Sequence, residues 1–513
     1  MSEERLETNK KSFMINVNYQ VLMVLIQRIS GFLINIVMVQ LLTPQNFGLF
    51  SLFQRLAETT TSVYRLGLSA SSQVLIAAPL EGKDKHDKGS LIGSALILNL
   101  VIIFLGTTFL IIFSDFVSEE IYQQSSIKPW LFCLILFCFF QAFENILEGI
   151  IKGFSAFKGL GLFNSYIAIL FLFFIPLFTW FFSLKGAIYI VTFFQVLRTA
   201  FYLIFTFNNI RLARVRINLK NFSSSSFAHL KIALPFYVPT LVLAPVSIYL
   251  LSILTTEEGL ESLAYLKILI SLGMIVFSIP NAMTAVFISR FAEEKDYMDH
   301  KENLNYLFSL NLKLVWLFSM ISSLILIAIL PAIIGFLFGD EYQKVLEIAP
   351  YYLPTITIIN LLNIFGSAFL ARRHALSVMT INMVMGFCWI LIGPYLISSF
   401  GLTGYLVAEL LSYLLSFISA IILYRHFFVP LSDFYKSTLI ITLIMAIIYV
   451  SVFYLNAIPE IAYRVLIFGS LCILLLALFW FFLINNRERI RMAYVLSEFR
   501  LKFRIFLENR KMS

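Results

Sequence analysis

Fourteen apolar segments follow one another along this chain, and each is near or above the roughly 20 residues that an α-helix needs to cross about 30 Å of hydrocarbon. Because 60% of the residues are hydrophobic and only 13% are charged, the chain cannot cover a water-exposed surface. The sequence therefore predicts an all-α, polytopic integral membrane protein. The segments are 13–42, 47–78, 90–113, 129–151, 161–182, 186–207, 229–254, 260–289, 304–337, 348–371, 375–397, 402–424, 437–455 and 461–484.

The Lys and Arg residues between the segments fall almost entirely in every second gap. The tails and the even-numbered gaps contain 28 of them, counting Lys231 in the first turn of the seventh segment. The opposite side carries only Lys128, Lys185, Lys344 and Arg464. By the positive-inside rule both termini are expected in the cytoplasm. The formal net charge of +9 follows from this bias, and it predicts contact with anionic membrane lipids, not with nucleic acid.

This orientation makes a direct prediction for single cysteines in a variant without the four native cysteines. A cysteine at Arg216 should be protected from an impermeant thiol reagent in intact cells, and a cysteine at Ser118 should react. Labelling at 216 together with protection at 118 would contradict the orientation.

Two short internal matches indicate a duplicated architecture. A shift of 218 residues aligns Gly186 with Gly404, and a shift of 211 aligns 48–52 with 259–263 at four positions. Both shifts span about six segments, as expected for the parallel repeats of some transporters. We therefore expect two pseudo-symmetric six-helix lobes and a terminal helix pair. The expected domains are an N-terminal lobe at 1–220, a C-terminal lobe at 221–425, the last two helices at 426–484 and a basic amphipathic cytoplasmic tail at 485–513.

The seventh segment contains Pro235, Pro239 and Pro245. Each proline removes a backbone donor and crowds the preceding turn, so a bend or a break is expected there. The sequence leaves two interpretations open, a static kink and a hinge used in gating.

The sequence lacks the common motifs for nucleotide binding, metal binding and nucleophilic catalysis. It contains no GxxxxGK[ST], HExxH, GxSxG or CxxC pattern, so we expect neither an enzyme nor a cofactor. A membrane-embedded polymerase or ligase would be expected to have acidic residues in a sizeable outer loop, and the outer gaps are short. Four cysteines lie within apolar segments, where they are expected to pack as small hydrophobic residues: Cys133, Cys138, Cys388 and Cys472.

Ten formal charges lie well inside the apolar segments. Exposure of any of them to lipid would cost several kcal/mol, so they should face a protein interior or a wet cavity. The cationic surplus of six to four suits an anionic substrate such as a phosphate or pyrophosphate headgroup. The candidate substrate-binding residues are Arg28, Arg55, Arg65, Arg198, Lys267 and Lys313, and the acids are Glu58, Glu144, Glu148 and Glu409.

Several of these charges belong to polar stripes at helical spacing. The longest, in the second segment, predicts a helix face that lines water. The alternative is that Arg55 and Glu58 merely neutralise each other, and for every acid an interhelical ion pair competes. The stripes consist of Ser51, Arg55, Glu58, Ser62, Arg65 and Ser69 in segment 2; Gln141, Glu144, Glu148 and Lys152 in segment 4; Lys267, Ser271 and Ser278 in segment 8; Tyr405, Glu409, Ser412 and Ser416 in segment 12; and Arg28, Gly31 and Asn35 in segment 1.

Three stretches carry a family resemblance. The run LLTPQNFGLFSLFQRLAETTTSVYRLGLSASSQ at 41–73 resembles the opening of the Wzx-type flippases for O-antigen and exopolysaccharide, in the MOP superfamily. There, a loop ending in Gly and an aromatic residue leads into a polar second helix and a small-residue patch. The stretches FGSAFLARRHAL at 365–376 and FGLTGYLVAELLSY at 400–413 are similar to further parts of the family.

The resemblance implies a V-shaped bundle of two lobes around a central cavity in the bacterial inner membrane. It implies that alternating access moves an undecaprenyl-pyrophosphate-linked oligosaccharide from the inner to the outer leaflet. Its implied protein partners are a polysaccharide polymerase and a chain-length regulator. Related lipid II flippases use arginines in helices 1, 2 and 8 for the headgroup, and the matching residues here are Arg28, Arg55 and Lys267. Lys267 departs from the pattern, since an ammonium group cannot bind pyrophosphate as a planar fork.

Coupling to H⁺ or Na⁺ is a further implication of the resemblance, with four candidate carriers. Two alternatives to a flippase remain. A multidrug or cation exporter of the MATE type would share the architecture but should have a neutral or acidic binding site, and a membrane-bound polymerase or ligase comes third. Most aromatic residues are expected to face lipid, with a few rings available to stack on saccharide. The candidate coupling residues are Glu58, Glu144, Glu148 and Glu409.

Overall fold

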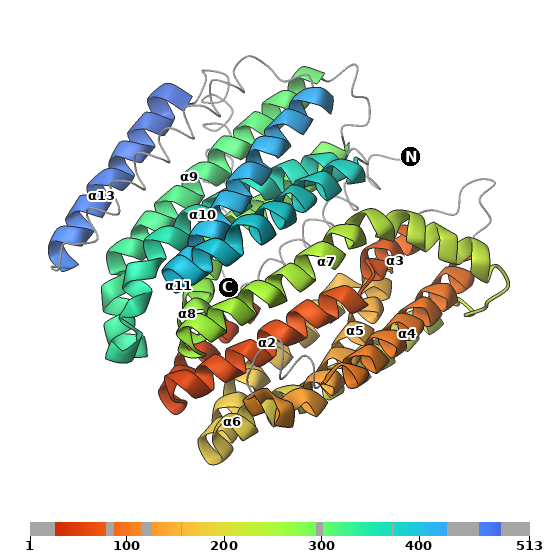
Figure 1. Ribbon diagram of the computed structural model, residues 1–513. Coiled ribbons are helices and arrows are strands. Elements are labelled where there is room, and N and C mark those ends of the chain that lie inside the picture. The colour runs from red at the N-terminus through yellow and green to blue at the C-terminus, as the bar shows by residue number, and fades with distance from the viewer. Residues whose placement is uncertain are drawn as a thin grey trace, which may run out of the picture.

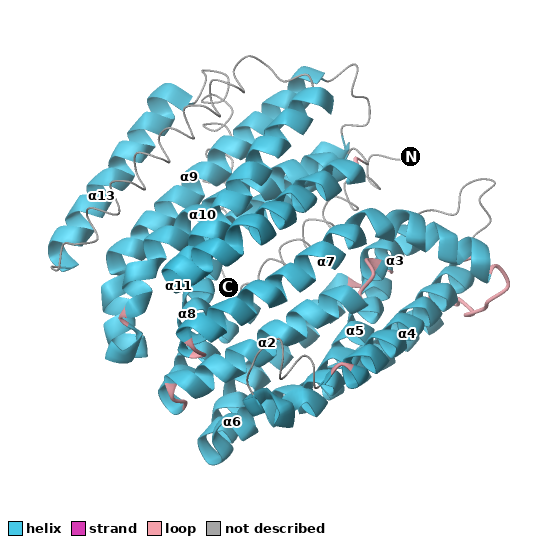
Figure 2. Cartoon of the chain, in the orientation of Figure 1, coloured by secondary structure: helices cyan, strands magenta, loops and turns pink. Residues whose placement is uncertain are grey.

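The computed structural model describes residues 26–77, 87–114, 125–154, 156–293, 301–371, 374–427 and 461–483. Within these ranges all regular structure is helical, and the connections are short (Figure 2). This confirms the predicted all-α class. The helices are Ile26–Leu41, α2 (Pro44–Tyr64), α3 (Leu68–Ala77), α4 (Lys88–Ile112), α5 (Leu131–Gly153), α6 (Phe157–Leu212), α7 (Phe222–Glu258), α8 (Glu261–Glu293), α9 (Lys301–Ile333), α10 (Lys344–Ala371), α11 (Ala375–Phe427) and α13 (Ile461–Leu478). Short helical turns complete them at Ser125–Trp130, Ile334–Phe338, Asp340–Tyr342 and Phe479–Leu483.

Seven helices in the described ranges are long and apolar enough to cross a membrane, so the chain is a multi-pass membrane protein. Two of them, α6 and α11, are 56 and 53 residues long and each contains one residue with non-helical backbone angles. In α6, Phe163 stacks on Phe201 with ring centroids 3.5 Å apart, so the two sides of Ser183 lie side by side. Each long helix is therefore a hairpin of two crossing helices, as the sequence predicts. The thirteenth predicted segment and both tails lie outside the described residues.

The two hairpins repeat the same backbone geometry 218 residues apart. Ser183 has φ 52° and ψ −139°, and Gly401 has φ 56° and ψ −131°. Three residues after each reversal, Gly186 and Gly404 face the carbonyl oxygen of the residue eight positions earlier, where a Cβ atom would lie within 2.0 and 1.9 Å of that oxygen. The alignment of Gly186 with Gly404 in the sequence thus corresponds to a structural repeat.

The reversal at Gly401 is held by Glu258, the last residue of α7. Its Oε1 accepts from the Leu402 backbone N–H at 2.8 Å, and its Oε2 accepts from the Lys344 ammonium at 2.7 Å. A Cβ atom on Gly401 would lie 1.7 Å from Oε1, and the positive φ is unfavourable for any other residue.

Gly401→Ala is expected to lower the free energy of unfolding by about 1–3 kcal/mol, because it strains the backbone and displaces the carboxylate. The thermal midpoint of the detergent-solubilised protein measures this. Ser183→Gly, at the matched reversal, is the control and should not lower the midpoint. An unchanged midpoint for Gly401→Ala would contradict the role of Glu258.

The second predicted segment is two helices, not one. Thr43 caps the start of α2, and Pro44 occupies its first turn, where a missing N–H is tolerated. The helix ends at Tyr64, and the chain turns through Leu66 and Gly67, both with positive φ, before α3 begins. The prediction of one helix over 47–78 was therefore wrong at this turn.

The helices form two groups, with α7 running between them (Figure 1). Helices α2 to α6 make one group, and α8 to α11 with α13 make the other. The first turns of α7 are bound to the first group, since Ser225 bonds Ser90 at 2.7 Å and His229 bonds Ser71 at 2.9 Å. Its later part packs along α11, ending at Glu258. Helix α7 therefore connects the two halves of the molecule mechanically.

Pro235 and Pro239 lie between these two attachments, and Pro245 lies where α7 already packs on α11, since Val242 and Leu243 come close to Gly386. The helix continues through all three prolines without a break, and its course is bent in Figure 1, which is the first of the two outcomes expected from the sequence. We expect Pro239→Ala to change the distribution of distances between spin labels on the two halves, because it restores a backbone donor where the helix passes from one half to the other. Pro331→Ala in α9 is the matched control. Identical distance distributions for Pro239→Ala and the wild type would leave only a static kink.

At the end of the bundle where α2 begins, the two halves touch. A Cβ atom on Gly48 would lie 2.0 Å from the carbonyl oxygen of Leu260, the residue before α8, so only glycine permits this approach of α2 to the start of α8. Nearby, Asn35 donates to the Ser271 hydroxyl at 2.7 Å and Gln40 donates to the Leu337 carbonyl at 3.2 Å. The space between the halves is closed at this end.

Candidate functional site

A cavity of about 450 Å³ lies between the two halves of the molecule. One wall is formed by α2 and the others by α7, α8, α10 and α11, so both halves contribute. Its size is typical of a site for a small molecule or headgroup. The lining residues are Arg55, Glu58, Thr59, Ser62, Thr240, Leu243, Ala244, Ser247, Leu266, Ile270, Tyr352, Trp389, Tyr405, Glu409 and Tyr413.

Three charged side chains face this cavity. Arg55 and Glu58 come from α2, and Glu409 comes from α11 in the other half. Arg55 lies within electrostatic range of both carboxylates. None of the three forms a hydrogen bond or a close ion pair with another residue of the described ranges, so they remain available to a ligand. The alternative that Arg55 and Glu58 merely neutralise each other thus finds an electrostatic interaction at a distance and no direct contact.

The polar stripe of the second segment reaches the cavity only in its middle. Arg55, Glu58 and Ser62 line it, as predicted. Ser51 is buried and donates to the Phe47 carbonyl of its own helix at 2.8 Å. Arg65 is exposed and outside the lining because α2 ends beside it. The stripe was predicted on one continuous helix, and the turn at 65–67 interrupts it.

The stripe of the twelfth segment divides in the same way. Tyr405 and Glu409 line the cavity. Ser412 and Ser416 are buried and donate to carbonyl groups one turn earlier in α11, at 2.8 and 3.0 Å. Serines on a polar stripe can therefore donate hydrogen bonds to backbone carbonyl groups of their own helix instead of facing water.

The other cations predicted to bind substrate lie outside the lining of this cavity. Arg28 donates to the Met274 carbonyl at 3.4 Å and lies 5.3 Å from the Phe277 ring centroid, which connects the first helix to α8. Lys267 follows a lining residue on α8 and is within electrostatic range of Arg55 and Glu58. Lys313 is buried in α9. Arg28 thus contacts α8 and Lys267 lies within electrostatic range of two lining residues, whereas Lys313 is not among the lining residues.

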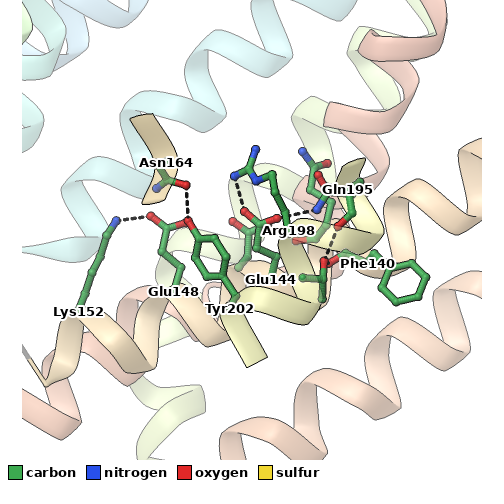
Figure 3. Close-up of polar contacts among 11 residues, drawn as sticks. Phe140, Glu144, Glu148, Lys152, Asn164, Gln195, Arg198 and Tyr202 are labelled. Carbon is green, nitrogen blue, oxygen red and sulfur yellow. Dashed lines mark hydrogen bonds and ion pairs between the residues drawn. The ribbon is translucent and has the colours of Figure 1, made fainter. Parts of the chain in front are cut away.

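A separate polar network lies within the group formed by α2 to α6 (Figure 3). Arg198 on α6 is ion-paired with Glu144 on α5, and Gln195 donates to the second oxygen of Glu144 at 2.7 Å. Glu148 pairs with Lys152 one turn along α5 at 2.7 Å. The alternative of an interhelical ion pair therefore holds for Glu144.

This network borders a second cavity, of about 270 Å³, between the first helix, α5 and α6. Arg198, Glu148 and the hydrogen-bonded pair Tyr202 and Asn164 line it. Substrate between the two halves would not meet these residues. The cavity between the halves is accordingly lined by one cation and two acids, so the predicted cationic surplus is not found in its described lining.

Three of the four aromatic residues that line this cavity could not be identified from the sequence. Tyr352, Trp389 and Tyr413 line it together with Tyr405. Aromatic residues are 16% of the chain, so composition could not single them out. Tyr413 lies two helical turns after Tyr405, and this spacing was the available signal.

The sequence matches no family model and no curated protein. Its fold is similar to that of solved transporters. A lipid II flippase, MurJ in an inward closed conformation, covers 90% of this chain and 98% of its own length at a TM-score of 0.68 and 16% identity. A multidrug resistance MATE family transporter of the MOP superfamily, inward-facing, covers 78% and 94% at a TM-score of 0.62 and 16% identity. A MOP superfamily transporter from Pyrococcus furiosus, described as having a binding pocket of reverse polarity, covers 81% and 95% at 0.59 and 17%. The chain shares the fold of these solved structures.

Proposed function

We propose that the protein flips undecaprenyl-pyrophosphate-linked oligosaccharide from the inner to the outer leaflet of the bacterial inner membrane, for O-antigen or exopolysaccharide synthesis. The observation that carries this proposal is Arg55, a guanidinium without a close partner among the described residues, in a cavity that both halves form. A guanidinium binds phosphate through two parallel hydrogen bonds. Hydroxyl groups and aromatic rings share the cavity, as an amphipathic headgroup requires.

Alternating access fits the contacts between the halves. With both termini in the cytoplasm, the end closed by Gly48 and Leu260 is the outer end. The cavity is then shut toward the outside, and opening requires the halves to separate there. Helix α7, bound to both halves, would carry that motion. Arg28, which joins the first helix to α8, and Lys267, which follows a lining residue, are proposed to assist the headgroup during it.

Coupling to H⁺ or Na⁺ would use carboxylates. Glu58 and Glu409 face the substrate cavity, and Glu148 faces the second cavity. The delivered lipid-linked oligosaccharide must be consumed in the outer leaflet, so a polysaccharide polymerase and a chain-length regulator are the proposed protein partners.

Reconstitution into vesicles tests the proposal. Lipid-linked oligosaccharide is extracted from a strain in which the gene is deleted and placed with the protein in liposomes. Because flipping equilibrates the two leaflets, impermeant periodate should oxidise nearly all of the sugar, against about half in protein-free liposomes. Oxidation of half of the sugar with well-folded protein would contradict the proposal.

A multidrug or cation exporter of the MATE type is the second candidate. It is favoured by the two carboxylates and four aromatic rings around the cavity, a combination that can bind an organic cation. Transport of tetraphenylphosphonium by the same vesicles, without movement of lipid-linked sugar, would establish it. Arg55 in the same cavity opposes a cation and is the reason that we place the flippase first.

A further inference from the structure

The two sides of the cavity differ in chemistry. The α2 wall presents Arg55, Glu58 and two hydroxyl side chains. The wall formed by α10 and α11 presents four aromatic rings and a single carboxylate, Glu409. A ligand that spans the cavity therefore meets a polar, charged side and a flat, ring-lined side.

Two features of α11 build the ring-lined side. Tyr405, Glu409 and Tyr413 are four residues apart and so lie on one face of the second half of α11. The chain reversal at Gly401 brings Trp389, which precedes the reversal in α11, against Tyr405, which follows it. The two rings meet edge to face, with centroids 5.7 Å apart and an interplanar angle of 64°. Tyr405 thereby fixes the orientation of the indole.

The Trp389 indole and the Glu409 carboxylate, both on this side, have no hydrogen-bond partner among the described residues. The Trp389 side chain is 6% exposed, and its indole N–H is buried without an acceptor. More than nine in ten buried polar groups in proteins are paired, so an unpaired donor beside a cavity indicates a position for a ligand acceptor. The Glu409 carboxylate, which also makes no hydrogen bond within the described ranges, supplies acceptors on the same side.

A sugar ring has the complementary surface. Its C–H groups form an apolar face that packs flat on an aromatic ring, while its hydroxyl groups lie around the edge and both donate and accept hydrogen bonds. We propose that Trp389, Tyr405, Tyr352 and Glu409 form a saccharide subsite that holds the sugar next to the pyrophosphate. This inference rests on the proposed function. In it, the rings stack on the sugar, Glu409 accepts from its hydroxyl groups, and the indole N–H donates to a hydroxyl or acetamido oxygen.

The geometry favours a sugar over an organic cation on this side. A cation would gain from Glu409 and the rings, but Arg55 shares the cavity within electrostatic range of Glu409. A sugar attached to a pyrophosphate divides between the two sides: the phosphates pair with Arg55, which outweighs the neighbouring Glu58 only through direct hydrogen bonds, and the electroneutral sugar faces the rings and Glu409.

Binding measurements on the purified, full-length protein in nanodiscs test the subsite. The probes are undecaprenyl pyrophosphate, the lipid-linked oligosaccharide extracted from the deletion strain, and tetraphenylphosphonium. For the wild type we expect the sugar-bearing lipid to bind about tenfold more tightly than undecaprenyl pyrophosphate. Trp389→Leu should remove most of this difference and leave the affinity for undecaprenyl pyrophosphate unchanged, whereas Trp389→Phe should keep part of it because a ring remains.

The controls separate the subsite from the proposed function. Trp180→Leu removes a tryptophan that is 74% exposed on the outer surface of the bundle and should change neither affinity. If Trp389→Leu keeps the full preference for the sugar-bearing lipid, the subsite is refuted and the flippase stands. If neither lipid binds the wild type, the proposed function itself fails. If tetraphenylphosphonium binds and Trp389→Leu abolishes that binding, the rings form a cation site and the proposal is overturned. Thermal midpoints show whether Trp389→Leu is correctly folded. If its folding is impaired, the test is decided by the binding of the two lipids to Trp389→Phe.

Discussion

Arg198→Ala is expected to remove most of the folded protein from the membrane. The substitution leaves the Glu144 carboxylate, which is 4% exposed, with Gln195 as its remaining hydrogen-bond partner in the described structure. Breaking a buried ion pair from one side costs about 3–5 kcal/mol, a large share of the stability of a typical domain. Membrane abundance and the thermal midpoint after solubilisation measure the effect.

Two further variants show whether the loss comes from the unpaired charge. Glu144→Gln combined with Arg198→Met removes both charges and should restore most of the abundance, since replacing a whole buried pair is often tolerated. Arg65→Ala removes an exposed arginine near the same acids and should change abundance little. If Arg198→Ala is instead abundant but inactive, Arg198 acts on substrate, as the sequence alone led us to expect.

Much of this fold could be predicted from the sequence because membrane helices follow simple constraints. Hydropathy placed the chain reversals after 182 and 397, within a few residues of Ser183 and Gly401. Gly186 and Gly404, which revealed the repeat, are required as glycines because each approaches a backbone carbonyl. Length, hydropathy and glycine spacing are local properties, and a single sequence displays them.

The candidate site was predictable only in part, for physical reasons that particular residues show. The free-energy cost of exposing a charge to lipid correctly identified Arg55 and Arg198 as residues that must avoid lipid. It could not distinguish them, because the partner of Arg198 lies on another helix, 54 residues away. Nor could it show that Ser412 bonds its own helix or that the reversal at Gly401 places Trp389 on Tyr405. These properties depend on the packing of helices distant in the sequence.

Arg55→Ala should abolish transport while leaving the protein folded. Arg55 is half-buried in the cavity and forms no hydrogen bond or close ion pair with another described residue, so its removal breaks no polar contact of the fold. Loss of a desolvated, hydrogen-bonded charge pair with a phosphate would cost about 2–5 kcal/mol, or roughly 30-fold to several thousandfold in affinity. In a deletion strain carrying the variant, surface polysaccharide should fall to near the level of the deletion while membrane abundance stays near normal.

Companion variants make this result specific to headgroup binding. Arg55→Lys should rescue only in part, because an ammonium group keeps the charge and loses the planar, two-bonded grip on phosphate. Arg28→Ala and Lys267→Ala should reduce polysaccharide less than Arg55→Ala, since neither side chain is among the residues that line the cavity. Arg65→Ala, on the same segment but outside the cavity, should leave polysaccharide unchanged. Normal polysaccharide at normal abundance in Arg55→Ala would exclude the headgroup role. If Arg55→Ala instead lowers the amount of protein in the membrane, and adding Glu58→Gln restores it, Arg55 forms a structural pair with Glu58, one turn away in α2.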